Sequence, residues 1–196
     1  MPNWCACTIS IKGSEEDMKV FYPTLDKPNE SGDKVDFSFH QTVPSANDGK
    51  KFFTGPGELP NTGNWGTKWD ACEVKILKKE PTEFFIHCET AWSPPLDWGH
   101  KFANKFRSLT VIIAYCEQGM QFYGVWTGCG KDRKTITEEY KFMDDDMLSY
   151  RTEEQIDATG NKVEVRIRDD DDPDDFAPNG RLKEFMEKYS LEHTGG

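Results

Sequence analysis

Five residues in two short segments could form a binding site for a ligand or a partner protein. They are Trp65, Lys68, Trp69, Asp70 and Trp92. Indole rings combine a flat apolar face with one N–H donor, so converging tryptophans can stack on a base, a sugar or a partner side chain. Lys68 and Asp70 add polar specificity to such a site. The alternative is that the rings close the open end of a sandwich, with Asp70 capping a turn and Lys68 in solvent.

A second candidate surface is acidic. Residues 144–175 hold 13 acidic and 4 basic residues, so this stretch carries −9 of the net charge of −11 and the remainder carries only −2. The runs that define it are Asp144, Asp145, Asp146, Asp169, Asp170, Asp171, Asp172, Asp174 and Asp175. Such runs are usually solvated loops. They could also imitate the phosphate charge of nucleic acid and occupy a basic groove on another protein.

No set of residues has the spacing that a known catalytic or metal site requires. The acidic runs lack the spaced pattern of a calcium loop, and the four histidines lack metal-ligand spacing. His87 and Glu89 share one strand face and could be an acid–base pair, but alternating polar residues on an exposed strand also explain them. The glycines around Pro56 lack the Lys-Ser/Thr of a phosphate loop. We therefore expect no catalysis, no metal and no cofactor.

The composition also bears on partners and location. A nearly neutral body argues against direct nucleic-acid binding, which needs clustered Lys and Arg. The six cysteines include no Cys-x-x-Cys pair and are typical of buried thiols in a reducing compartment; a metal or redox role of Cys5 and Cys7 is the alternative. No apolar run reaches the roughly 20 residues that span a bilayer, and the start lacks a signal peptide. We expect a cytoplasmic protein.

Hydrophobic periodicity predicts the elements that position these residues. Residues 4–12 alternate as a strand, and Ser14 is the predicted N-cap of a helix that Pro23 shortens. Residues 28–64 read as a long loop with a possible short strand at 35–40. Strands at 72–78 and 83–90 form a hairpin.

A second helix follows, with Ser93 as its N-cap and Pro94 at its first position, and runs to about Phe106. Strands at 109–116 and 120–127 come next. The first of these is apolar on both faces, which predicts a central strand covered on both sides.

This order predicts an α+β fold, a ferredoxin-like split βαβ sandwich whose antiparallel sheet has two helices on one face and one added strand. We divide the chain into a ferredoxin-like domain, residues 1–130, and an acidic extension, residues 131–196. The extension ends in an amphipathic helix over 179–191, with apolar residues at helical spacing, that should dock on the body.

Three motifs in the same order resemble a known family. They are the opening Met-Pro-Asn-Trp-Cys, the segment from Asn64 to Ala71, and the segment from Thr90 to Pro95. Over residues 1–128 the chain resembles the YubB-type ferredoxin-like proteins of phages and conjugative plasmids. The resemblance implies a ferredoxin-like domain and an origin on a mobile element, but it supplies no catalytic residues. The acidic stretch departs from the family pattern.

These observations favour an accessory protein that binds and inhibits or modulates a host protein with a basic surface. An anti-defence factor, either anti-CRISPR or anti-restriction, is the form that the mobile-element context suggests. The alternative is a small-ligand or nucleotide-binding module with a pocket lined by Trp65, Trp69 and Trp92.

Overall fold

The computed structural model of the 196-residue chain describes residues 3–45, 62–130, 134–141, 150–156, 162–168 and 180–191. The acidic runs at 144–146 and 169–175 lie outside these ranges. In the described part of the chain, no helix is long and apolar enough to cross a membrane.

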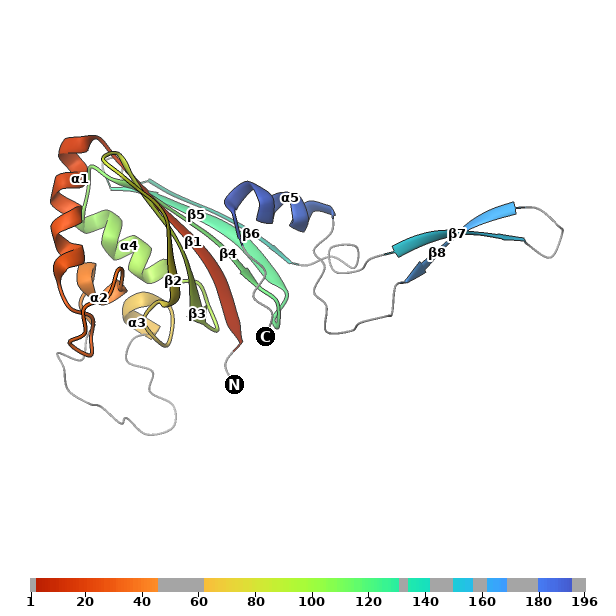
Figure 1. The fold of residues 1–196 in the computed structure, drawn as a ribbon, viewed down its shortest axis with the longest axis horizontal. Coiled ribbons are helices and arrows are strands. Elements are labelled where there is room, and N and C mark those ends of the chain that lie inside the picture. Colours follow the sequence, from red (N-terminus) through yellow and green to blue (C-terminus); the bar gives the residue numbers. More distant parts are fainter. Residues whose placement is uncertain are drawn as a thin grey trace.

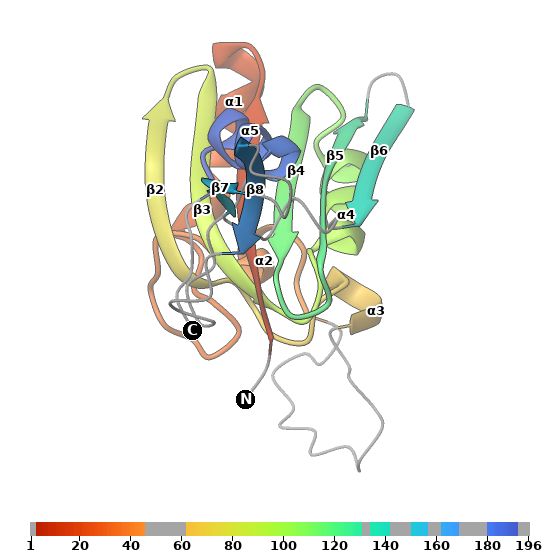
Figure 2. The same cartoon turned by 90° about the vertical axis from the view of Figure 1, so that its right-hand side faces the viewer.

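A six-stranded antiparallel sheet forms the centre of the molecule (Figures 1 and 2). Its spatial order is β2-β3-β1-β4-β5-β6. The strands are β1 (Trp4–Lys12), β2 (Cys72–Glu80), β3 (Glu83–Ala91), β4 (Thr110–Glu117), β5 (Phe122–Cys129) and β6 (Lys134–Lys141). The first four give the β2-β3-β1-β4 order of a ferredoxin-like sheet; β5 is the added strand that the sequence predicts, and β6 is a second added strand that it does not. The predicted fold class is confirmed.

Two helices cover one face of this sheet, on the left in Figure 1. Helix α1 (Glu15–Phe21) begins after Ser14, whose hydroxyl accepts the N–H of Asp17, as the sequence predicts. Pro23 follows in a 3-10 turn, η1 (Tyr22–Asp26), because proline cannot donate the next α-helical bond. Helix α4 (Leu96–Lys105) lies beside α1 (Figure 1), and its Phe102 ring contacts that of Phe21.

The core between this helical layer and the sheet is mostly aromatic. Phe21 packs edge-on against Phe84 and Phe102, with ring centroids 5.5 and 5.7 Å apart. Trp98 lies 5.0 Å from Phe102 and donates its indole N–H to Thr42 Oγ1 at 2.8 Å. Burying one such ring stabilises the fold by about 1.5–3 kcal/mol. A few large rings therefore supply the core of a chain with only 36% hydrophobic residues.

Helix α5 (Gly180–Tyr189) covers the opposite face, which we call the open face of the sheet (Figure 1, right). Leu182 and Met186 are buried against a group of β1, β4 and β5 residues: Ala6, Ala114, Cys116, Tyr123 and Val125. Thr8 Oγ1 also donates to Tyr189 O at 2.8 Å. The predicted docking helix is confirmed, and it explains why β4 is apolar on both faces.

Two local predictions are wrong. Residues 35–40 form no strand; instead Ser38 begins a short helix, α2 (Phe39–Thr42), with a capping box closed by Gln41. Phe37 and Phe39 are both buried in the core, but Phe37 precedes α2 and Phe39 is its first residue, so neither lies on a strand. Ser93 does not cap α4, because Pro95 holds that position and the Ser93 hydroxyl donates to Gly66 O.

Two elements that follow residue 130 join the sheet domain. β6 pairs with β5 along its whole length, and α5 packs on the open face. A separate two-stranded sheet consists of β7 (Tyr150–Ile156) and β8 (Lys162–Arg168). The remaining described helix, α3 (Thr62–Trp65), leads the chain into the Trp65–Asp70 segment.

Candidate functional site: an exposed tryptophan patch

Hydrogen bonds join the two segments that carry the predicted site. Thr67 Oγ1 donates to Ala91 O at 3.0 Å, and Ser93 Oγ donates to Gly66 O. Gly66 has a φ of +83°, and a Cβ there would lie 3.2 Å from backbone atoms of three residues, so this approach needs glycine. The loop before β2 is therefore attached to the end of β3.

Trp65 is the first of the predicted site residues that the structure places in the interior. Its ring is fully buried beside Phe39, with centroids 6.0 Å apart, and its indole N–H donates to Val43 O at 2.8 Å. Both the apolar ring and the donor are thus used within the fold. Trp65 closes the end of the sandwich and does not face solvent.

Asp70 also has a structural partner set. Its carboxylate accepts from Ser38 Oγ at 2.5 Å, from the N–H of Phe39 at 2.6 Å and from the N–H of Ala71 at 2.8 Å. Burial raises the pKa of Asp70, and these donors oppose the rise. Asp70 therefore fastens the loop before β2 to the start of α2.

The other three predicted residues reach the surface together with Trp4. Trp69 and Trp92 are 41% and 43% exposed, and the Trp69 ring lies 5.8 Å from that of half-buried Trp4. Lys68 Nζ lies 5.1 Å from the Trp69 ring centre, within cation–π range. Trp92 lies on the segment that is hydrogen-bonded to the Lys68–Trp69 loop. We call Trp4, Lys68 and Trp69, together with Trp92 on this adjoining segment, the tryptophan patch.

The sequence reading missed Trp4. A tryptophan at the first position of a strand is an ordinary core residue by pattern, and only the loop before β2 brings Trp69 to it. The alternation of side chains along β1 could have identified it. Trp4 shares the face of Ala6 and Thr8, which is the face opposite to the core side that Cys5 occupies.

Trp92 holds an unusual backbone conformation. Its φ is +72°, a region that bulky residues rarely adopt. The conformation is fixed on both sides, since the Trp92 N–H donates to Asn3 O at 2.9 Å and Thr90 Oγ1 donates to Ser93 O at 2.8 Å. Strained residues that are nevertheless held in place are enriched at functional sites.

Acidic side chains lie near the patch. Glu89 lies opposite Ala6 and Cys72 in the sheet, on the same face as Trp4. Burial raises the pKa of Glu89, the negative charge of Glu73 adds to the rise, and Lys75 opposes it. Burial and the nearby carboxylates likewise raise the pKa of Cys72.

His87, the other half of the considered acid–base pair, is buried on the open face of β3, two residues before Glu89. Cys5 and Cys7 lie in the core with their sulfurs 3.9 Å apart, and burial holds the pKa of the Cys5 thiol well above its usual value. In the ranges that the structure describes, no three His, Cys, Asp or Glu side chains gather as a metal site does.

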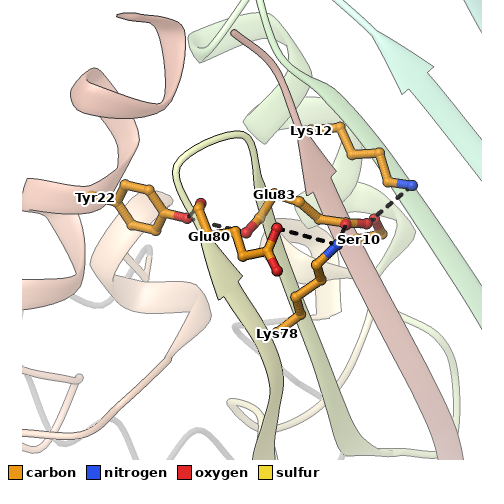
Figure 3. Close-up of polar contacts among 6 residues, drawn as sticks. All are labelled: Ser10, Lys12, Tyr22, Lys78, Glu80 and Glu83. Carbon is orange, nitrogen blue, oxygen red and sulfur yellow. Dashed lines mark hydrogen bonds and ion pairs between the residues drawn. The ribbon is translucent and has the colours of Figure 1, made fainter. Parts of the chain in front are cut away.

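A second group of titratable side chains lies at the β2–β3 turn (Figure 3). Glu83 receives Lys78 Nζ at 2.6 Å and Lys12 Nζ at 3.0 Å, and the Lys78 hydrogen bond lowers the pKa of Glu83. The Tyr22 hydroxyl donates to the backbone oxygens of Glu80 and Glu83. The Lys78 contact closes the hairpin itself, whereas those of Lys12 and Tyr22 join it to β1 and η1, so the cluster is a structural clamp.

The fold and this site define a ferredoxin-like α+β protein with an exposed aromatic surface at one end of its sheet. Residues 64–161, which are 98 of the 196, match the family described as the ferredoxin-like domain in Api92-like protein. The chain belongs to this family.

In three dimensions the chain is similar to protein api92 from Yersinia pseudotuberculosis, at 9% sequence identity and a TM-score of 0.45. The similarity covers 73% of this chain and 99% of that one. None of the curated proteins matches this chain in sequence.

Proposed function

We propose that this protein acts without catalysis, by binding a partner protein through the tryptophan patch and modulating that partner. The observation that carries the proposal is the pair of half-exposed rings, Trp69 and Trp92, held on a hydrogen-bonded loop pair with Trp92 in a strained conformation. Tryptophan is enriched among the residues that dominate binding energy at protein interfaces.

The fold adds a second argument, against sheet-surface recognition of single-stranded RNA. Proteins that share this topology stack bases on aromatic residues of the sheet. Here α5 buries the corresponding centre of the open face, including Tyr123. The patch lies beside this covered area, at the start of β1 and the end of β3, and is accessible.

The finer form of the proposal concerns origin and target. The protein is an accessory factor of a phage or plasmid of the YubB type, it is cytoplasmic in the host cell, and it inhibits or modulates a host defence protein. The sequence of residues 144–175 supports a basic partner surface through its excess of negative charge. The acidic runs would then add long-range attraction to the contact made by the patch.

The small-ligand alternative is less well supported. It requires Trp65, Trp69 and Trp92 to line one pocket, whereas Trp65 is buried with its N–H already bonded to Val43. An anionic nucleotide would also meet the carboxylate of Glu89, on the face of Trp4, and that of Glu73 near it.

Site-specific photo-crosslinking tests the proposal. A benzoylphenylalanine at position 69 should crosslink one discrete protein in host cells, whereas the same group at Val20, which is 65% exposed on α1, should not. The crosslinked protein is then purified and its activity is measured. The native chain should change that activity, and the Trp69→Ala, Trp92→Ala variant should leave it unchanged. Identical crosslinking from both positions, or none from position 69, would contradict the patch as the contact surface.

Charge reversal tests the acidic runs separately. Changing Asp169, Asp170, Asp171 and Asp172 to lysine should weaken capture of the crosslinked protein and flatten its salt dependence. Capture that is insensitive both to salt and to this change would remove the electrostatic part of the proposal and leave the patch in place.

A further inference from the structure

We infer that the tryptophan patch and its two neighbouring glutamates receive an arginine side chain of the partner protein. This inference rests on the proposed function and names the chemistry of the contact. It follows from three features of the surface: the positions of the rings, the positions of the carboxylates, and the contact of a lysine ammonium group with one of the rings.

The aromatic and acidic groups share one face. Trp4 pairs with Ala91 in the β1–β3 ladder, and Glu89, two residues before Ala91 on the same face of β3, lies opposite Ala6. Diagonal neighbours on one face of a sheet are about 7–8 Å apart, within reach of long side chains. Trp69 reaches Trp4 from the loop before β2, with ring centroids 5.8 Å apart. One extended side chain can therefore span the rings and the carboxylate of Glu89.

Glu73 enters this surface through an irregularity in β2. The β2–β3 register shifts between Cys72 and Lys75, and Glu73 has a φ of +46°. Bulges of this kind redirect a side chain from its regular position. Burial raises the pKa of Glu89, and the charge of Glu73 adds to the rise, so the two carboxylates are within electrostatic range of each other.

The lysine contact on the Trp69 ring indicates that the ligand is positively charged. Lys68 Nζ already lies over the Trp69 ring at 5.1 Å, which is the attraction that an indole face exerts on a cation. An anion placed here would be repelled by Glu73 and Glu89. Among cationic side chains, arginine fits both parts of the surface, since its planar guanidinium stacks on an aromatic face and bonds a carboxylate in bidentate geometry.

Lys68 and Lys75 are the opposing charges. Lys75 is exposed on β2 opposite His87, and Lys68 competes for the Trp69 ring. Both reduce the negative potential that Glu73 and Glu89 create, and Lys75 lowers the pKa of Glu89 against the effects of burial and of Glu73. Removal of Lys68 should therefore strengthen the binding of a guanidinium.

The test uses ¹⁵N-labelled full-length protein and two blocked tripeptides, acetyl-Gly-Arg-Gly-amide and acetyl-Gly-citrulline-Gly-amide. Citrulline keeps the shape of arginine and lacks its charge. The arginine peptide should shift the indole N–H signals of Trp4 and Trp69. The buried rings Trp65, Trp98 and Trp126 should stay in place and report that the protein is folded. The affinity of the citrulline peptide should be lower by a factor of about five or more.

Variants complete the test. The Glu73→Gln, Glu89→Gln double variant should bind the arginine peptide no better than the citrulline peptide, and Lys68→Gln should bind it more tightly. A control with the same charge change elsewhere, Glu15→Gln with Glu184→Gln, should behave as the native protein; both residues are exposed on α1 and α5. Equal binding of the two peptides, or an unchanged double variant, would overturn the inference. If the photo-crosslinked partner is still captured by that double variant, the proposed function survives and only the arginine contact fails.

Discussion

The carboxylate of Asp70 accepts the backbone N–H of Phe39 at 2.6 Å, and so connects the loop that carries Lys68 and Trp69 to the start of α2. The same carboxylate holds Ser38, which caps that helix. The exposed ring of Trp69 therefore stands next to a residue anchored in the interior. A contact surface whose supporting loop is held in this way loses little conformational entropy on binding.

Asp70→Ala should lower the free energy of unfolding by about 1–3 kcal/mol, because the N–H of Phe39 is left without its acceptor. Urea denaturation followed by tryptophan fluorescence measures the change. Asp36→Ala, at an exposed position in the same region, is the matched control and should leave the midpoint in place. Equal midpoints for the two variants would contradict a structural role of Asp70.

Glu83 should make stability depend on pH. The Lys78 hydrogen bond lowers the pKa of Glu83 in the folded protein, so its stabilisation is complete above the unfolded pKa near 4.5 and is lost as the pH falls through the lower folded value. Glu83→Gln should therefore be slightly less stable than the native protein at pH 7. The difference should shrink in strong acid and at high salt, because the cluster is close to solvent.

Denaturation curves at several pH values give this comparison. Glu16→Gln removes an exposed ion pair with Lys19 on α1 and serves as the control for loss of one surface pair. A Glu83→Gln deficit that stays constant below the folded pKa would show that the ion pairs are not its cause.

Trp92→Asn should separate stability from binding. Asparagine tolerates a positive φ better than tryptophan, so the change should raise the free energy of unfolding by up to about 1 kcal/mol while it weakens partner capture. Trp69→Asn should weaken capture without this gain, since Trp69 has no such φ. Thermal unfolding and the crosslinking assay are the two measurements. A clear loss of stability in Trp92→Asn would mean that the ring is held for packing and not for contact.

Gly99→Ala should destabilise the core, by about 1–3 kcal/mol from overpacking. An added Cβ would lie 2.8 Å from both Ile113 Cδ1 and Trp126 Cζ3, closer than real contacts allow. Gly63→Ala, where nothing lies within 4 Å, is the control and should show only the helix propensity of alanine. The two unfolding midpoints should therefore move in different directions.

Leu182→Ala should weaken the packing of α5 on the sheet, because truncation of a buried leucine lowers the free energy of unfolding by about 2–5 kcal/mol. Cys116 lies beneath α5, and burial together with the charge of Glu117 raises its pKa to about 12. Local opening should therefore increase the alkylation rate of Cys116 at least about tenfold, as measured by peptide mass spectrometry. Glu184→Ala, on the exposed side of α5, should not change that rate.

The sequence determined the ferredoxin-like core because local signals and the global fold agree. Period-two alternation in β1, the Ser14 cap and the apolar stripe of α5 each agree with the element that forms there, and the order of the elements is that of a split βαβ fold. The both-sided apolarity of β4 even predicted that something must cover the open face.

The sequence could not sort the five candidate residues. Trp65, Trp69 and Trp92 are the same residue type in similar surroundings along the chain, yet one is buried and two are exposed. The division depends on hydrogen bonds between segments far apart in sequence, Asp70 with Phe39 and Thr67 with Ala91. Only the folded chain decides which ring meets solvent, because burial is a property of what packs from elsewhere and not of the residue itself.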